Sequence, residues 1–298
     1  MSKPYFQFSN ISNIEVATFD NSLSNFYSQG IEGTIKEDIQ NALDAKLTNS
    51  EDPIKLKITF DSVPKHDIPG IDEVFTHINS LKGANTYTTE TIDYMKYQES
   101  IVNIPVLTIE DSNTKGLSGA KNGQSHDRQD TYGVYAYSKG VHSIEDNERN
   151  EISRGGSHGI GKIANNAASD IHLMYFANCD EYGNRHLGGT IQLIEHRVEN
   201  QSYRSTGYFT DIIKNENNTK FYPFENKNFS PVFSKESRGL KIIIPYVREE
   251  FNNPIRIIRS ICDNFFLAIL NKRLEVSVKT DDKIVDINHS TLKSIVTN

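Results

Sequence analysis

The stretch RGGSHGIGKI, residues 154–163, has the glycine content of a loop that holds phosphate groups. Glycine lets backbone N–H groups approach an anion without side-chain clash, and the start of a helix directs such groups outward. The spacing Gly156-x-x-x-x-Gly161-Lys162 suggests a Walker A loop, but that motif continues with Ser or Thr and this chain has Ile163. The preceding residues, NERNEIS, are also too polar for the buried strand that a Walker A loop follows. The glycines therefore indicate a phosphate cradle of another kind.

Two other segments place acids and an amide where they could share such a site. Glu37, Asn41 and Asp44 recur at helical spacing and fall within about 60° of one another around a helix. Asp111 ends the apolar segment IPVLTIED, residues 104–111. Each feature alone has an ordinary structural explanation, as a solvated helix face, a strand-end cap or a flexible loop. Their joint occurrence in this order is much less expected by chance.

Together the three segments resemble the ATP-binding domain of the GHKL superfamily, which includes DNA gyrase B subunits, MutL, the Bergerat-fold heat-shock chaperone, MORC proteins and sensor histidine kinases. EDIQNALDA, residues 37–45, is similar to the MutL and MORC motif E-x-x-x-N-x-x-D-A, and the resemblance spans roughly residues 20–247. It implies that Glu37 is the general base acting on the attacking water. It also implies that Asn41 binds Mg²⁺ and that Asp44 borders the nucleotide. Histidine kinases lack this base, so Glu37 favours the hydrolysing branch.

The resemblance also assigns Asp111 to the amino group of adenine, because a carboxylate can only accept a hydrogen bond and so rejects the oxo group of guanine. The family usually continues D-x-G-x-G, whereas this chain reads DSNTKGL, with Asn113 at the first glycine position and Gly116 one residue late. This variant resembles GHKL proteins of bacterial defence and other mobile loci. The final strand begins Gly239-Leu240 where the family often has Gly-Thr, so one hydroxyl on the adenine side is missing.

On the same resemblance, residues 112–160 form a lid over ATP, and the glycine cluster is the hinge where the lid meets a helix. The cluster residues expected at the phosphates are Gly156, Ser157, His158, Gly159, Ile160, Gly161 and Lys162. A lysine from the following domain often completes such a site, and Lys279 is a candidate.

Hydrophobic periodicity predicts the elements that position these residues. Helices are expected at 31–46, about 71–81 and 253–270, and strands at 54–61, 104–111, 171–177, 189–196, 202–209 and 239–247. The Asn-rich segment 214–231 is expected to be an exposed loop. The order predicts an α+β fold. With the resemblance, this is a Bergerat-fold two-layer α/β sandwich on a mixed, mostly antiparallel sheet over residues 1–250. Residues 251–298 would begin a second small, transducer-like α/β domain that is cut short.

Composition limits the partners. The chain has 298 residues, 36% of them hydrophobic, enough for a substantial core. Its apolar runs fall short of the roughly 20 residues of a membrane helix, and residues 1–8 do not resemble a signal peptide. Two cysteines without metal spacing fit a reducing compartment, so we expect a cytoplasmic protein with no membrane partner. The net charge of −7 does not indicate DNA as a partner, although a local basic groove is compatible with it.

The sequence thus predicts a slow ATPase that uses ATP and Mg²⁺, with ATP ordering the lid and closing a homodimer that controls an unknown effector, in bacterial anti-phage defence or DNA processing. The main alternative is a nucleotide-gated scaffold with negligible hydrolysis. A histidine kinase would need an upstream helix with a phosphorylated histidine, and an α+β domain that binds no nucleotide is the remaining alternative.

Overall fold

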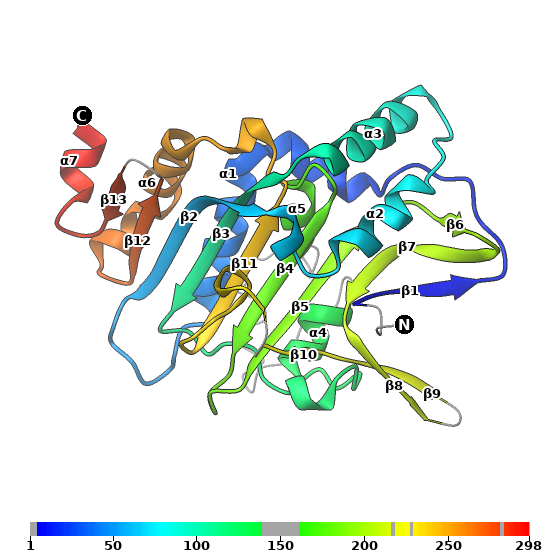
Figure 1. Cartoon of the computed structure of the whole chain (residues 1–298). Helices are drawn as coiled ribbons and strands as arrows, with labels where there is room; N and C mark the ends of the chain where they lie inside the picture. The colour runs from blue at the N-terminus through cyan, green and yellow to red at the C-terminus, as the bar shows by residue number, and fades with distance from the viewer. Residues whose placement is uncertain (1–4, 139–160, 216–217, 227–228, 281–282, 298) are drawn as a thin grey trace.

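The computed structural model describes residues 5–138, 161–215, 218–226, 229–280 and 283–297 (Figure 1). Its helices are α1 (Asn21–Asp44), α2 (Ile71–Asn79), α3 (Thr86–Tyr97), α4 (Thr131–Tyr137), α5 (Lys162–Ala167), α6 (Pro254–Leu270) and α7 (Leu292–Thr297). Its strands are β1 (Phe6–Ile11), β2 (Ile54–Pro64), β3 (Asn103–Ser112), β4 (Leu173–Cys179), β5 (Arg185–Gln192), β6 (His196–Val198), β7 (Gln201–Phe209), β8 (Asp211–Asn215), β9 (Asn218–Tyr222), β10 (Phe224–Glu225), β11 (Gly239–Pro245), β12 (Leu274–Lys279) and β13 (Ile284–Ile287).

One large sheet organises the molecule, and its strand order is β1-β7-β5-β4-β11-β3-β2-β12-β13. The pairing of β12 with β2 is parallel and the other pairings along this path are antiparallel, so the sheet is mixed and mostly antiparallel, as predicted. Helices α1, α5 and α6 pack together as a layer on one face, and α2 and α3 cover part of the other face at one end (Figure 1). The predicted α+β sandwich class is confirmed.

Helix α1 is the element on which the helix layer is built. Asp20 caps its start by accepting a hydrogen bond from Ser22 N, and Gly30 interrupts it with φ 67° and ψ −167°, a conformation that glycine adopts at little cost. The predicted helix therefore corresponds to the part after this break. There Ile31, Ile35 and Ile39 are fully buried against the sheet at helical spacing.

The bounds predicted for strand β5 differ from those in the structure, and two glycines lie inside the strand. The sequence predicts a strand at 189–196, whereas β5 runs from Arg185 to Gln192. Both glycines lie inside β5, where a side chain would collide with Phe176 at Gly188 and with Met174 O at Gly189. Glycine occupies a strand interior here because neighbouring atoms fill the space of a Cβ.

The Asn-rich segment was also predicted wrongly in part. It contains β9, which pairs with β8 as a two-stranded sheet, and β10, which pairs with β5. The ring of Phe221 on β9 packs against Tyr137 and Tyr208, with centroids 5.6 and 5.5 Å away. Aromatic packing thus orders a segment whose polar composition predicted a loop.

The last fifty residues extend the main sheet. Helix α6 connects to β12, which pairs with β2 in parallel register from Leu274↔Ile54 to Lys279↔Thr59. Glu32 of α1 receives two hydrogen bonds from Arg256 of α6, at 2.6 and 2.9 Å. The boundary predicted at residue 250 stays a prediction, but the strands after it belong to the same sheet as those before it.

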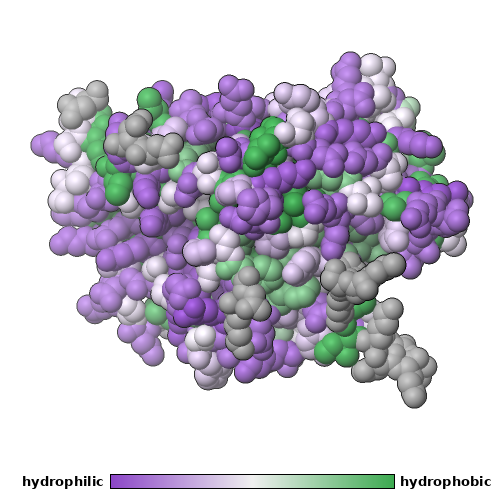
Figure 2. All heavy atoms as spheres, in the orientation of Figure 1, coloured by the Kyte–Doolittle hydropathy of each residue, from purple (hydrophilic) through white to green (hydrophobic). Residues whose placement is uncertain are grey.

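The visible surface in Figure 2 is mostly hydrophilic, with hydrophobic residues in small separate groups. Within the described residues, no helix combines the length and apolar character that crossing a bilayer requires.

Leu274→Ala tests whether the C-terminal strands unfold with the rest of the chain. Leu274 is fully buried beside β2, so its truncation should cost about 2–5 kcal/mol of the free energy of unfolding and shift one cooperative transition. Thermal and urea unfolding followed by circular dichroism measure this. Lys279→Ala, exposed on the same strand, is the matched control and should change stability by less than about 0.5 kcal/mol. Two separate transitions, with only one shifted, would contradict a shared unfolding unit.

Candidate functional site

Asp111 lies at the end of β3 in the centre of the sheet and is buried, with 8% of its surface exposed. Its Oδ1 accepts hydrogen bonds from Thr114 Oγ1 at 2.6 Å and from Leu240 N at 2.7 Å. Burial raises the pKa of Asp111 to about 6, and these two bonds oppose that rise. The carboxyl is therefore mainly ionised at neutral pH, and its Oδ2 accepts no hydrogen bond from the described part of the chain.

The neighbouring backbone is built around this carboxyl group. Gly239 has φ 136°, and a Cβ there would overlap Asp111 Oδ1. The hydroxyl expected at position 240 in the family is absent, but Thr114, 1% exposed, brings a hydroxyl to the same carboxylate from another segment. Thr114 was not predicted as a site residue, because nothing in the local sequence shows that its hydroxyl reaches Asp111.

The departures at Asn113 and Gly116 are explained by backbone conformation. Asn113 has φ 64° and Gly116 has φ 67°, both in the left-handed region. Asn tolerates this region better than other non-glycine residues, so Asn113 adopts a conformation typical of glycine. A side chain at Gly116 would approach Cys179 O, and Asn178 holds the next residue, Leu117, through hydrogen bonds of 2.7 and 2.9 Å.

Glu37 and Gly161 come together although 124 positions separate them in sequence. Gly161 begins α5, which packs against α1, and a Cβ at Gly161 would overlap the Glu37 carboxylate. The backbone of Gly161, the last glycine of the cluster, therefore lies against the Glu37 carboxylate. Gly156, Ser157, His158, Gly159 and Ile160 lie outside the described residues, so their predicted roles stay predictions.

Asn41 and Asp44 follow Glu37 along α1 and are both exposed to solvent. Asp44 accepts a hydrogen bond from Gln40 Nε2 at 3.0 Å. The amide of Asn41 is thus accessible to a ligand one helical turn after Glu37, and no group of three His, Cys, Asp or Glu side chains that could hold a metal occurs among the described residues. Lys279 lies exposed at the end of β12.

Lys162, which the sequence predicts at the phosphates, contacts backbone carbonyl groups in this structure. Its Nζ donates hydrogen bonds to Tyr135 O and Ser138 O, both at 2.6 Å, at the C-terminal end of α4. The carbonyl groups at a helix C-terminus attract a cation. Lys162 therefore fastens α4 to the start of α5.

Tyr135 of α4 lies between Phe176 and the acids of the candidate site. It packs edge-on against Phe176, with centroids 4.9 Å apart. Burial raises the pKa of the Tyr135 phenol well above its ordinary value, and the carboxylates of Asp38, Glu37 and Asp111 raise it further. All three acids therefore lie around one side chain of α4.

Asp38 is the site residue that sequence reasoning missed. It is buried on the same helix face as Ile35 and Ala42, and Asn165 Nδ2 of α5 donates a hydrogen bond to its Oδ1 at 3.0 Å. An acid inside the apolar stripe of an amphipathic helix is the signal that could have found it.

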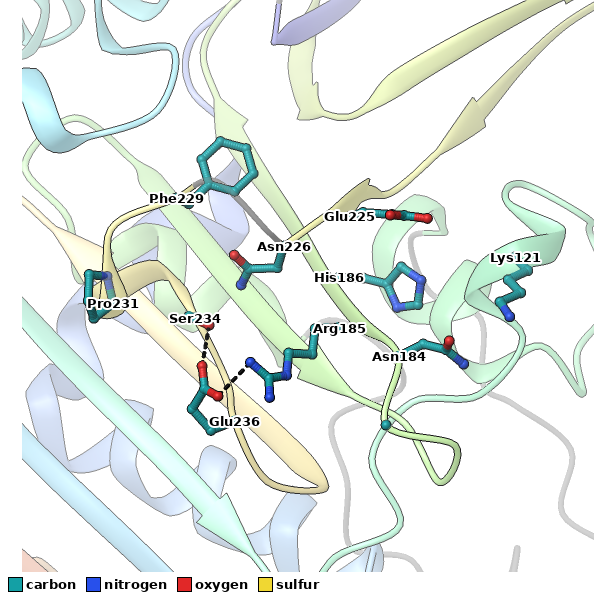
Figure 3. A pocket seen from close by; sticks show the side chains of 11 residues that line it. Lys121, Asn184, Arg185, His186, Glu225, Asn226, Phe229, Pro231, Ser234 and Glu236 are labelled. Atoms are coloured by element: carbon teal, nitrogen blue, oxygen red, sulfur yellow. Dashed lines mark hydrogen bonds and ion pairs between the residues drawn. The ribbon is translucent and has the colours of Figure 1, made fainter.

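A polar cavity of about 530 Å³ lies elsewhere, near the turn between β4 and β5 (Figure 3). Arg185 forms an ion pair with Glu236 across it at 2.5 Å, and Ser234 donates to the same Glu236. None of the predicted site residues lines this cavity.

No protein-family model matches the chain, and a search of curated proteins also finds no match.

Thr114→Val should raise the pKa of Asp111, because it removes a hydrogen bond that holds that pKa down. The folded-state pKa of Asp111, about 6, is above the ordinary value. The contribution of this carboxyl group to the free energy of unfolding therefore falls as pH rises from about 4 to about 6. The variant should therefore lose about 1–3 kcal/mol at pH 8 and less at pH 4. Urea unfolding across this range measures the difference, with Thr114→Ser as the control that keeps the hydroxyl. An equal loss at both pH values would show that the hydroxyl does not act on the carboxylate.

Proposed function

We propose that this chain binds ATP with Mg²⁺ and hydrolyses it slowly, as a GHKL-type ATPase. The observation that carries the proposal is a pair of acid positions, one on β3 in the sheet and one on α1 in the helix layer, that both act on the pKa of Tyr135. At one, a buried ionised acid, Asp111, has one oxygen fixed and one left to accept. At the other, a glycine backbone, Gly161, lies against the carboxylate of Glu37.

Asp111 suits recognition of adenine. Thr114 and Leu240 N fix its Oδ1, which leaves Oδ2 as an oriented acceptor. The exocyclic amino group of adenine donates to such an acceptor, whereas guanine presents an oxo group at that position and leaves a buried charge unpaired.

Glu37 suits activation of water. Its carboxylate lies beside the first turn of α5, where the absent side chain of Gly161 lets backbone and ligand approach. A positioned carboxylate can orient the attacking water and accept its proton. Mg²⁺, held through the exposed amide oxygen of Asn41 and the phosphates, would supply charge neutralisation.

The wider role follows the sequence prediction. Residues 112–160 would act as the lid, ATP would close a homodimer, and the cycle would control an effector in a cytoplasmic bacterial defence or DNA-processing system. At the predicted hinge, Lys162 fastens α4 to α5 through Tyr135 O and Ser138 O, and its contact with phosphate stays a prediction.

Glu37→Gln should leave ATP binding nearly unchanged and lower the single-turnover hydrolysis rate by about 10²–10⁴-fold, because it removes the base and keeps the side-chain shape. Quench-flow with labelled ATP measures the rate, and equilibrium dialysis measures binding. Glu32→Gln, on the same helix but paired with Arg256, is the matched control. Equal rates for wild type and Glu37→Gln would overturn the enzyme and leave the nucleotide-gated scaffold as the function.

Asp111→Asn should weaken ATP binding by about 10- to 100-fold, since an amide presents a donor or a misplaced acceptor to the adenine amino group. Titration calorimetry with a non-hydrolysable ATP analogue measures the affinity. Asp61→Asn, on the adjacent strand β2, is a suitable control. Unchanged affinity in a folded Asp111→Asn protein would refute this placement of the base.

A further inference from the structure

A pair of buried polar side chains joins α1 to α5 directly beside Glu37. Asp38 is 8% exposed and Asn165 is 1% exposed, and Asn165 Nδ2 donates to Asp38 Oδ1 at 3.0 Å. Polar groups at such depth normally satisfy all their hydrogen-bonding atoms, because an unpaired one costs free energy.

The second atom of each group is buried without a partner. Asp38 Oδ2 and Asn165 Oδ1 are both inaccessible to solvent and make no hydrogen bond to any residue that the structure describes. If Asp38 were ionised, both of these atoms would be acceptors, and neither could satisfy the other. The hydroxyl of Thr34, one turn earlier on the same helix, is buried too but makes no bond to either atom.

We infer that Asp38 keeps its carboxyl proton in the folded chain and donates it from Oδ2 to Asn165 Oδ1. The amide and the acid then exchange two hydrogen bonds, one in each direction, as an acid–amide pair. A single proton satisfies both orphaned atoms at once.

The surrounding charges favour the protonated acid. Burial raises the pKa of Asp38 most, the Asn165 hydrogen bond lowers it, and the carboxylates of Glu37 and Asp111 raise it as well, so that the pKa is about 7. From α4, the Tyr135 phenol faces the same acids and is neutral, because burial raises its pKa. Among the described residues, the charged groups that shift the Asp38 pKa are thus the carboxylates of Glu37 and Asp111, while the Lys162 ammonium at the start of α5 binds Tyr135 O and Ser138 O.

The pair has a consequence for Glu37, and this part rests on the proposed ATPase. Asn165 lies one helical turn after Gly161, whose backbone touches the Glu37 carboxylate. By holding α5 on α1, the pair sets the distance between that backbone and that carboxylate. Asp38 is therefore a positioning residue, and as a neutral neighbour it adds no second negative charge beside the proposed base.

Asp38→Asn tests the pairing without reference to ATP. The new amide can exchange two hydrogen bonds with Asn165 as the protonated acid does, but it cannot ionise. The pKa of Asp38 is about 7 in the folded protein and near 4 in the unfolded chain. Its contribution to the free energy of unfolding therefore falls as pH rises between these two values and is constant above them. The Tm of wild type should therefore fall relative to that of Asp38→Asn between pH 5 and pH 8, by more than the scatter of replicate scans.

Asp93→Asn, exposed on α3, is the control and should keep the pH trend of wild type. Asp111 and Asp170 also titrate in this range, but they are present in all three proteins, so their effect cancels. A wild-type Tm that stays parallel to that of Asp38→Asn from pH 5 to pH 8 would overturn the protonated pair.

The second measurement concerns hydrolysis. The ratio of the Asp38→Asn kcat to the wild-type kcat should rise between pH 6.5 and pH 8.5, because the wild-type acid ionises over this range and the amide does not. Asp38→Ala should lower kcat about tenfold with little change in KM, because the proposed base loses its alignment and not its substrate contacts. A folded Asp38→Asn protein as inactive as Asp38→Ala would show that Asp38 acts as a carboxylate. Absence of ATPase activity in wild type would refute the proposed function, while the Tm comparison would still decide the pairing.

Discussion

The packing of α1 onto the sheet is the constraint on which the rest of the structure depends. One face of this helix buries three isoleucines, and the adjoining positions bring Glu37 and Asp38 to the same interface with α5. Side chains on a helix keep fixed angular relations, so burying the apolar stripe also fixes where the acids point. The interface with α5 is therefore both part of the core and the wall of the candidate site.

Satisfaction of buried polar atoms explains why the site has its particular residues. A hydroxyl and a backbone N–H donate to one oxygen of Asp111 and lower its pKa, whereas Asp38 accepts a hydrogen bond from a single amide. Two acids on neighbouring elements can thus hold different protonation states near neutral pH, since the pKa of a buried acid follows the donors that reach it. Different protonation states would give the two acids different chemical roles.

The sequence predicts the helix layer and the central strands well, because their apolar periodicity is strong. Ile54, Leu56 and Ile58 alternate on β2 and are buried as expected. Helix α3 was not predicted, since its Thr- and Tyr-rich sequence has weak helix propensity and buried contacts of Ile92 and Met95 stabilise it instead.

Candidate site residues could be predicted where a sequence pattern marks them. They could not be predicted where their role depends on a partner that is distant in sequence. Glu37 and Asp111 were singled out because two local patterns, a helical spacing of polar residues and an acid at a strand end, occur together with a glycine cluster in one chain. The hydroxyl of Thr114 could not be assigned, because nothing in the local sequence shows that it reaches back to a carboxylate. Asn165 likewise acquires its role only when α5 lies on α1.

The contacts of Lys162 have a consequence for the entropy of the chain. One ammonium group binds the carbonyl oxygen atoms of Tyr135 and Ser138, so two points 24 residues apart are held together by a single cation. Bringing two distant points of a chain together costs conformational entropy, and this cost rises only slowly with the number of residues between them. The two charge-assisted hydrogen bonds of this one lysine offset that cost where α4 meets α5.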